Sequence, residues 1–154
     1  MIWIRQEFKP DLSDAFLEMR RHGIQVTIEG TDGCEILPEL ERRSDDRVVV
    51  KKRYSAFFGT VLDELLSDIG PDVLVLAGVN THACIRTTAI DAYQRDYDVI
   101  VASDCIGSHD DEHQRVTLRY MDDRIARLMS NEEIGELLRH DTPSNSAMEP
   151  TART

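Results

Sequence analysis

The sequence has few cysteines, a deficit of basic residues and no long hydrophobic run. Its three cysteines, Cys34, Cys84 and Cys105, are far apart and form no CxxC pair, which argues against a disulfide framework or a zinc site and is typical of a reduced, cytoplasmic protein. The formal net charge is -11, which argues against nucleic acid as a partner because such binding depends on phosphate neutralisation. No apolar run approaches the roughly 18 residues that span a bilayer, and the first residues show no signal peptide.

Apolar runs and helical spacing instead predict one α/β domain. The chain has 154 residues and is 41% hydrophobic, which suits a single globular core. Largely β-branched runs predict strands at residues 1–4, 48–50, 72–78, 98–103 and 125–129, and apolar periodicity predicts helices within residues 11–23, 55–70, 84–93, 112–121 and 130–140. Strands that alternate with helices and are continuously apolar predict a mostly parallel sheet covered on both faces. We assign residues 1–140 to this domain and expect a disordered tail at residues 141–154.

Three of these helices carry more detailed predictions. The helices within 55–70, 84–93 and 130–140 should each turn one face inward. In that order, the inward residues are Phe58, Leu62, Leu65, Leu66 and Ile69; Ile85, Thr88, Ala89 and Ala92; and Ile134, Leu137 and Leu138. Ile90 is apolar but lies outside the inward-facing set of the helix within 84–93, which hints at a subunit contact. Ser130 and Glu133 have the spacing of a capping box that starts the last helix.

Cys84 has the position of a nucleophile. It lies just beyond the strand at 72–78, in the first turn of the next helix, and ligands of parallel sheets bind outside the carboxyl ends of strands. A helix N-terminus favours a thiolate, and its free N–H groups can hold an oxyanion. The alternative is a small apolar residue that packs the helix onto the sheet.

Lys51 should reach the same edge of the sheet. It ends the strand at 48–50, and a cation there would stabilise a thiolate. The alternative is that Lys51, Lys52 and Arg53 form a solvated basic cluster.

Two segments carry a family resemblance. "KKRYSAFFGT" resembles the K-x-R-Y-S-A-F motif of the isochorismatase-like cysteine hydrolases, and "GVNTHACIRTTAIDAYQRDYDVIVASD" resembles the family's cysteine motif with its following strand. The resemblance implies a three-layer α/β/α fold with a six-stranded parallel sheet and a Cys-Lys-Asp triad. Cys84 holds the place of the nucleophile and Lys51 that of the lysine. Val79–Asn80 matches a non-proline cis peptide, and the Ala83 and Cys84 main chain matches the oxyanion donors.

The implied chemistry is hydrolysis of a small amide or ureido compound through a cysteine thioester. The cysteine favours acyl transfer over isochorismate cleavage, because members that cleave isochorismate need no such nucleophile. The resemblance implies no cofactor, a small-molecule substrate and a homo-oligomer.

The family's first strand, which ends in the triad aspartate, has no counterpart here. "MIWIRQEF" matches the second strand, so the sheet should lack the central strand between residues 1–4 and 72–78. Three interpretations are open: a true start upstream, which we favour; a truncated protein that folds poorly or pairs with another chain; or an inactive relative. Glu7 and Asp11 are acidic and nearby, but neither matches the motif, so turnover by this exact chain is doubtful.

Other residues offer weaker candidates. His109 and His113 in "HDDEH" look like metal ligands, but acidic residues are favoured at a helix start, and we predict no metal. A pocket would be lined by Tyr54, Phe57, His82 and Arg86, although an aromatic at helical spacing is more often core.

Three hypotheses follow. The leading one is a cytoplasmic cysteine hydrolase; the second is a non-catalytic relative that acts as a binding or interaction module. A nucleotide-binding domain is disfavoured because "AGVNTHA" fits neither GxGxxG nor the P-loop.

Overall fold

Within residues 1–140 the named strands pair in parallel, as predicted. The computed structural model describes residues 1–140, so the tail expected at 141–154 lies outside the described residues. One sheet has two strands, β1 (Ile2–Gln6) and β2 (Arg47–Lys51), which pair in parallel from Ile2–Arg47 to Gln6–Lys51.

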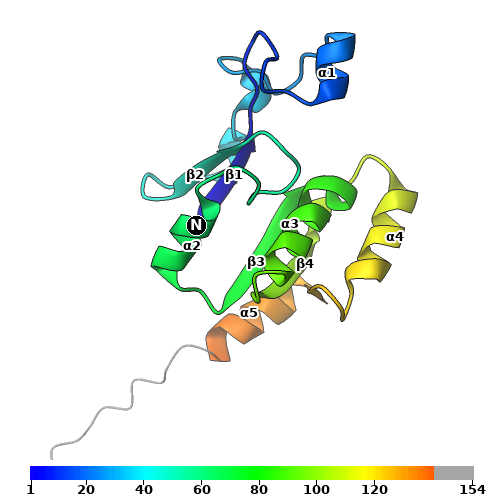
Figure 1. Ribbon diagram of the computed structural model, residues 1–154. Coiled ribbons are helices and arrows are strands. Elements are labelled where there is room, and N and C mark those ends of the chain that lie inside the picture. Colours follow the sequence, from blue (N-terminus) through cyan, green and yellow to red (C-terminus); the bar gives the residue numbers. More distant parts are fainter. Residues whose placement is uncertain (141–154) are drawn as a thin grey trace, which may run out of the picture.

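The second sheet holds the remaining strands of residues 1–140. Its order is β3 (Val73–Val79), β4 (Asp98–Gly107) and β5 (Arg127–Met129), with β4 in the middle. The helices are α1 (Leu17–His22), α2 (Leu62–Ile69), α3 (Arg86–Tyr93), α4 (Asp111–Met121) and α5 (Asn131–His140), with a π-helical turn at Thr81–Ile85 and 3-10 turns at Asp32–Cys34 and Pro38–Leu40. Figure 1 shows β1 and β2 beside α2, and α3 crossing β3 and β4. The class of fold is therefore the predicted α/β arrangement.

The sheet is interrupted where the resemblance places the absent strand. Within residues 1–140, β1 pairs only with β2 and β3 pairs only with β4, so each has one unpaired edge. The prediction that the strand at 72–78 is buried on both faces is wrong, because Val75 is 45% exposed and Val79 is 70% exposed. A strand without a second neighbour cannot be covered like the β4 strand, whose Val99–Ala102 run is buried.

A common core nevertheless joins the two sheets. Buried residues of α2, α3 and β4 pack together, and Ile2 of β1 packs against them. The inward stripe predicted for α3 is confirmed, since all four of its residues are buried. The face predicted for α2 is partly wrong: Phe58 is 65% exposed and Ile69 is 59% exposed. The helix begins only at Leu62, so Phe58 lies in the irregular segment before it.

The α1 segment has a small core of its own. Its buried members are Phe8, Leu12, Ala15, Met19 and Ile28. The helix begins at Leu17, follows Phe16 and has no side-chain cap; Gly23 ends it with a left-handed φ of 61°. Figure 1 shows this segment projecting past the strand ends.

The capping box of α5 is confirmed. Ser130 N–H donates to Glu133 Oε2 at 2.7 Å, and Glu133 N–H donates to Ser130 Oγ at 3.3 Å. Leu138, predicted to face inward, is 61% exposed, because the short β5 strand offers the helix little surface to cover. No helix in residues 1–140 is long and apolar enough to cross a membrane.

Candidate active site

Two side chains that are distant in sequence meet at the carboxyl ends of the strands. Lys51 is the last residue of β2, and Cys84 lies in the π-helical turn that follows β3. The Lys51 ammonium Nζ donates to Cys84 Sγ at 3.3 Å. The two sheets therefore present their carboxyl ends to one shared site.

The Lys51 ammonium is buried without a carboxylate. Its residue is 5% exposed, and Nζ also donates to the Arg53 carbonyl at 2.8 Å and to Gln6 Oε1 at 3.3 Å. No ion pair joins it to an acidic side chain within residues 1–140, whereas its neighbour Lys52 pairs with Asp14 at 3.1 Å. A buried cation is costly unless an anion is near. The Cys84 sulfur is the one of its three acceptors that can become an anion, because the other two are the amide and carbonyl oxygens of Gln6 and Arg53.

The turn that carries Cys84 is tightly anchored. The Val79–Asn80 peptide is cis, in agreement with the resemblance. Thr81 is fully buried and its hydroxyl donates to the Gly107 carbonyl of β4 at 3.0 Å. The Ala83 N–H donates to the Asn80 carbonyl at 3.2 Å and is thus engaged within the turn.

The residues suggested for a pocket wall are scattered. Phe57 is 3% exposed, packs in the core and lies under the Arg95 guanidinium at 4.4 Å, so it is not a wall residue. Arg86 stacks on Tyr120 of α4 at 5.1 Å. Tyr54 is 49% exposed and stays available at the surface.

His82 belongs to a cluster at the start of α4. Its Nδ1 contacts the Ser108 hydroxyl, and its ring centroid lies 4.9 Å from His109 and 5.4 Å from His113. Asp110 caps the helix by accepting from the His113 N–H at 2.7 Å; this bond and the nearby imidazoles lower the pKa of Asp110. Among residues 1–140, no three histidine, cysteine, aspartate or glutamate side chains are placed to hold a metal ion.

Gln6 is the site residue that the sequence did not reveal. It stands opposite Lys51 in the β1–β2 register, a relation that becomes visible only once the two strands are paired. The nearby acidic side chains are occupied elsewhere. Glu7 accepts from Arg5 at 2.7 Å, and Asp11 caps its own turn. Neither supplies the carboxylate that the family resemblance implies.

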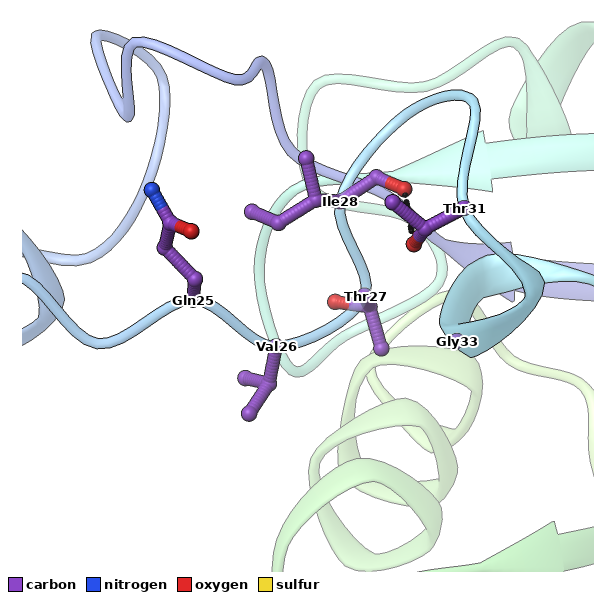
Figure 2. Close-up of a pocket in the computed structure, with 6 residues that line it drawn as sticks. All are labelled: Gln25, Val26, Thr27, Ile28, Thr31 and Gly33. Atoms are coloured by element: carbon purple, nitrogen blue, oxygen red, sulfur yellow. Dashed lines mark hydrogen bonds between the residues drawn. The ribbon is translucent and has the colours of Figure 1, made fainter.

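A hollow of the surface lies away from these residues. Figure 2 shows it along the segment before and within the first 3-10 turn, where a volume of about 460 Å³ is lined by Gln25, Val26, Thr27, Ile28, Thr31 and Gly33. Thr31 donates to the Ile28 carbonyl at 2.7 Å. Neither Lys51 nor Cys84 lines the hollow, so its surface is separate from the cysteine–lysine pair.

Fold and site together define a parallel α/β protein with a cysteine–lysine pair at the carboxyl edge of its strands, in which the lysine is buried and the cysteine half-buried. Residues 1–133 match the Isochorismatase domain. The chain belongs to the isochorismatase family.

Individual relatives agree with this assignment. Maleamate amidohydrolase of Pseudomonas putida is 40% identical over 85% of this chain and 62% of that protein. An isochorismatase family protein from Desulfovibrio vulgaris superposes with a TM-score of 0.82 at 31% identity, covering 90% of this chain and 74% of that one. N-carbamoylsarcosine amidase from Thermoplasma acidophilum superposes with a TM-score of 0.68 at 30% sequence identity, covering 84% of this chain and 70% of that one. The chain spans about half the length of the curated relatives it matches.

Proposed function

We propose that Cys84 is the nucleophile of a hydrolase that cleaves a C–N bond of a small amide or ureido compound. The observation that carries the proposal is the 3.3 Å contact between Lys51 Nζ and Cys84 Sγ, with the ammonium buried. An ammonium held against sulfur in a site of low exposure stabilises the thiolate, which is the reactive form.

The reaction proceeds in two balanced steps. The Cys84 thiolate forms a bond to the carbonyl carbon, the C–N bond breaks, and the departing nitrogen takes up a proton from solvent water. A water molecule then adds to the carbonyl carbon of the thioester, the C–S bond breaks with its electron pair returning to sulfur, and the carboxylic or carbamic acid leaves while the remaining proton of that water returns to solvent. The Cys84 N–H is the candidate oxyanion donor; the Ala83 N–H, which the resemblance also suggested, already donates to Asn80 at 3.2 Å.

The named relatives support the choice of bond. Maleamate amidohydrolase and N-carbamoylsarcosine amidase are both named for the cleavage of a C–N bond. Other relatives carry different names, such as the enterobactin synthase component B of Escherichia coli, and the cysteine is what favours acyl transfer in this chain.

A second candidate is a family member without turnover that acts as a binding module. The observation in its favour is that no carboxylate within residues 1–140 pairs with Lys51 or bonds Cys84. A general base that takes the thiol proton and activates water is then missing from the described site.

Alkylation by iodoacetamide tests the nucleophile directly. At about pH 7 we expect Cys84 to react faster than Cys34 or Cys105, and Lys51→Met to slow it about tenfold. Lys52→Met is the matched control, because Lys52 pairs with Asp14 and should have little effect. Equal slowing by both variants would contradict the proposed role of Lys51.

Turnover separates the two candidates. We expect maleamate or an N-carbamoyl amino acid to release ammonia in a reaction that Cys84→Ser abolishes. Fast alkylation of Cys84 without release from either compound would favour the binding module.

A further inference from the structure

Gln6 completes the surroundings of the Lys51 ammonium. It is the last residue of β1 and pairs with Lys51 in the parallel register. Its Oε1 accepts from Nζ at 3.3 Å, the Arg53 carbonyl accepts at 2.8 Å, and Cys84 Sγ accepts at 3.3 Å. An ammonium has three N–H donors, so two neutral oxygens occupy two of them and direct the third to the sulfur.

The neutrality of these oxygens has a chemical consequence. A carboxylate in place of the Gln6 amide would form an ion pair with Lys51 and cancel much of its charge at the sulfur. The acidic side chains on neighbouring segments are held elsewhere, since Glu7 pairs with Arg5 at 2.7 Å and Asp14 pairs with Lys52 at 3.1 Å. The thiolate is thus left as the anionic partner of the ammonium.

We infer that Gln6 is a positioning residue, whose amide orients the Lys51 ammonium toward Cys84 without neutralising it. This inference rests on the proposed function and deepens it, because Gln6 acts on the sulfur only through Lys51. Gln6 bonds Lys51 and has no hydrogen bond to Cys84 among the described contacts.

The test measures how fast iodoacetamide alkylates Cys84, by mass spectrometry, in Gln6→Ala and in the isosteric Gln6→Glu. At about pH 7 we expect Gln6→Ala to slow the reaction about threefold and Gln6→Glu about tenfold. At about pH 10 every variant holds the thiolate, and the rates should converge. A merely structural defect would change the rates at both pH values. Gln94→Ala, which removes an exposed amide that bonds the Ile90 carbonyl at 3.4 Å, should leave both rates unchanged.

A double-mutant cycle checks the route of the effect. In a Lys51→Met background, Gln6→Ala should no longer alter the alkylation rate, because the ammonium it orients is gone. Slowing that persists in this background, or an unchanged rate at about pH 7 in Gln6→Glu, overturns the inference.

If the parent Cys84 reacts no faster than Cys34 and Cys105, the proposed function falls and this inference with it. If it does react faster while the Gln6 variants match the parent, only this inference falls.

Discussion

At the residue scale, the environment of a side chain decides its role more than its type does. Lys51 and Lys52 are adjacent, yet the first is 5% exposed against a sulfur and the second pairs with Asp14 at the surface. Lys51 is the last residue of β2 and Lys52 lies in the bend that follows, so the two side chains leave the backbone toward different surroundings. The sequence indicated which lysine ends the strand at the site, because Lys51 immediately follows three β-branched residues.

Asp46 offers a residue-scale prediction that is independent of the site. The Trp3 indole N–H donates to the Asp46 carboxylate at 2.8 Å. This hydrogen bond is the largest cause that lowers the pKa of Asp46 to about 2, and hydrogen bonds from the Met1 amino group and the Arg43 N–H add to it. The folded state therefore favours the carboxylate. Its contribution to stability is fully present above the ordinary value of 3.8 and is lost as the pH falls toward about 2.

We expect Asp46→Asn to unfold at lower urea concentration than the parent near neutral pH, with a difference that shrinks between about pH 4 and pH 2. Far-UV circular dichroism during urea titration at several pH values measures this. The exposed neighbour offers the control Asp45→Asn, which should follow the parent throughout. A difference that is constant over this pH range would show that the carboxylate of Asp46 does not have the stated role.

The residues that could not be predicted share one cause. Gln6 meets Lys51 only through the pairing of strands that are 45 positions apart along the chain, and the Arg95 guanidinium that lies over the Phe57 ring comes from beyond the end of α3. Both depend on tertiary contacts that local spacing does not contain. For Phe57 the sequence offered both a pocket wall and the core, and its packing with Leu62 and Leu66 decides for the core.

At the element scale, the turn between β3 and α3 is held chiefly by Thr81. Its buried hydroxyl bonds the Gly107 carbonyl of β4 at 3.0 Å, which ties the Cys84 turn to the neighbouring strand. Thr81→Val keeps the shape but leaves that carbonyl without this donor. We expect a loss of about 1–3 kcal/mol in the free energy of unfolding, measured by urea titration.

Thr81→Ser is the matched variant, since it keeps the hydroxyl. We expect Thr81→Ser to keep most of the free energy of unfolding that Thr81→Val loses, with a small cost for the missing methyl group. If valine and serine destabilise equally, the methyl contact and not the hydrogen bond holds the turn.

Element boundaries show what the sequence can and cannot provide. The capping box of α5 was predicted from Ser130 and Glu133 because both partners lie within one turn. The start of α2 was missed because "SAFFGT" has helical apolar spacing, yet its backbone is drawn into other contacts: the Ala56 N–H donates to Thr88 of α3 at 3.0 Å. A tertiary bond of this kind overrides local propensity.

At the scale of the whole molecule, the two sheets share a site and a core but no backbone ladder. The parallel class of fold follows from the alternation of apolar strands and helices. The gap between β1 and β3 was expected only through the resemblance, because no local pattern records that a neighbour is absent.

This open arrangement makes a prediction about exchange and association. Within residues 1–140, β4 is paired on both edges at Ile100–Ala102, whereas β3 is paired on one side only, so alternate β3 amides should exchange hydrogen much faster than the amides of Ile100–Ala102 in the protein alone. The apolar edge region, with Val75 45% exposed, should also promote self-association. We expect Val75→Lys to reduce the concentration dependence of the sedimentation coefficient, because charge on an open edge opposes strand pairing. The control Val116→Lys alters a similarly exposed valine, at 49%, on α4 and should have little effect.

Equal protection of β3 and β4 would mean that another strand, from a second copy of the chain, already covers the edge, and Val75→Lys should then lower that protection. Equal protection that Val75→Lys leaves intact would contradict the open edge itself.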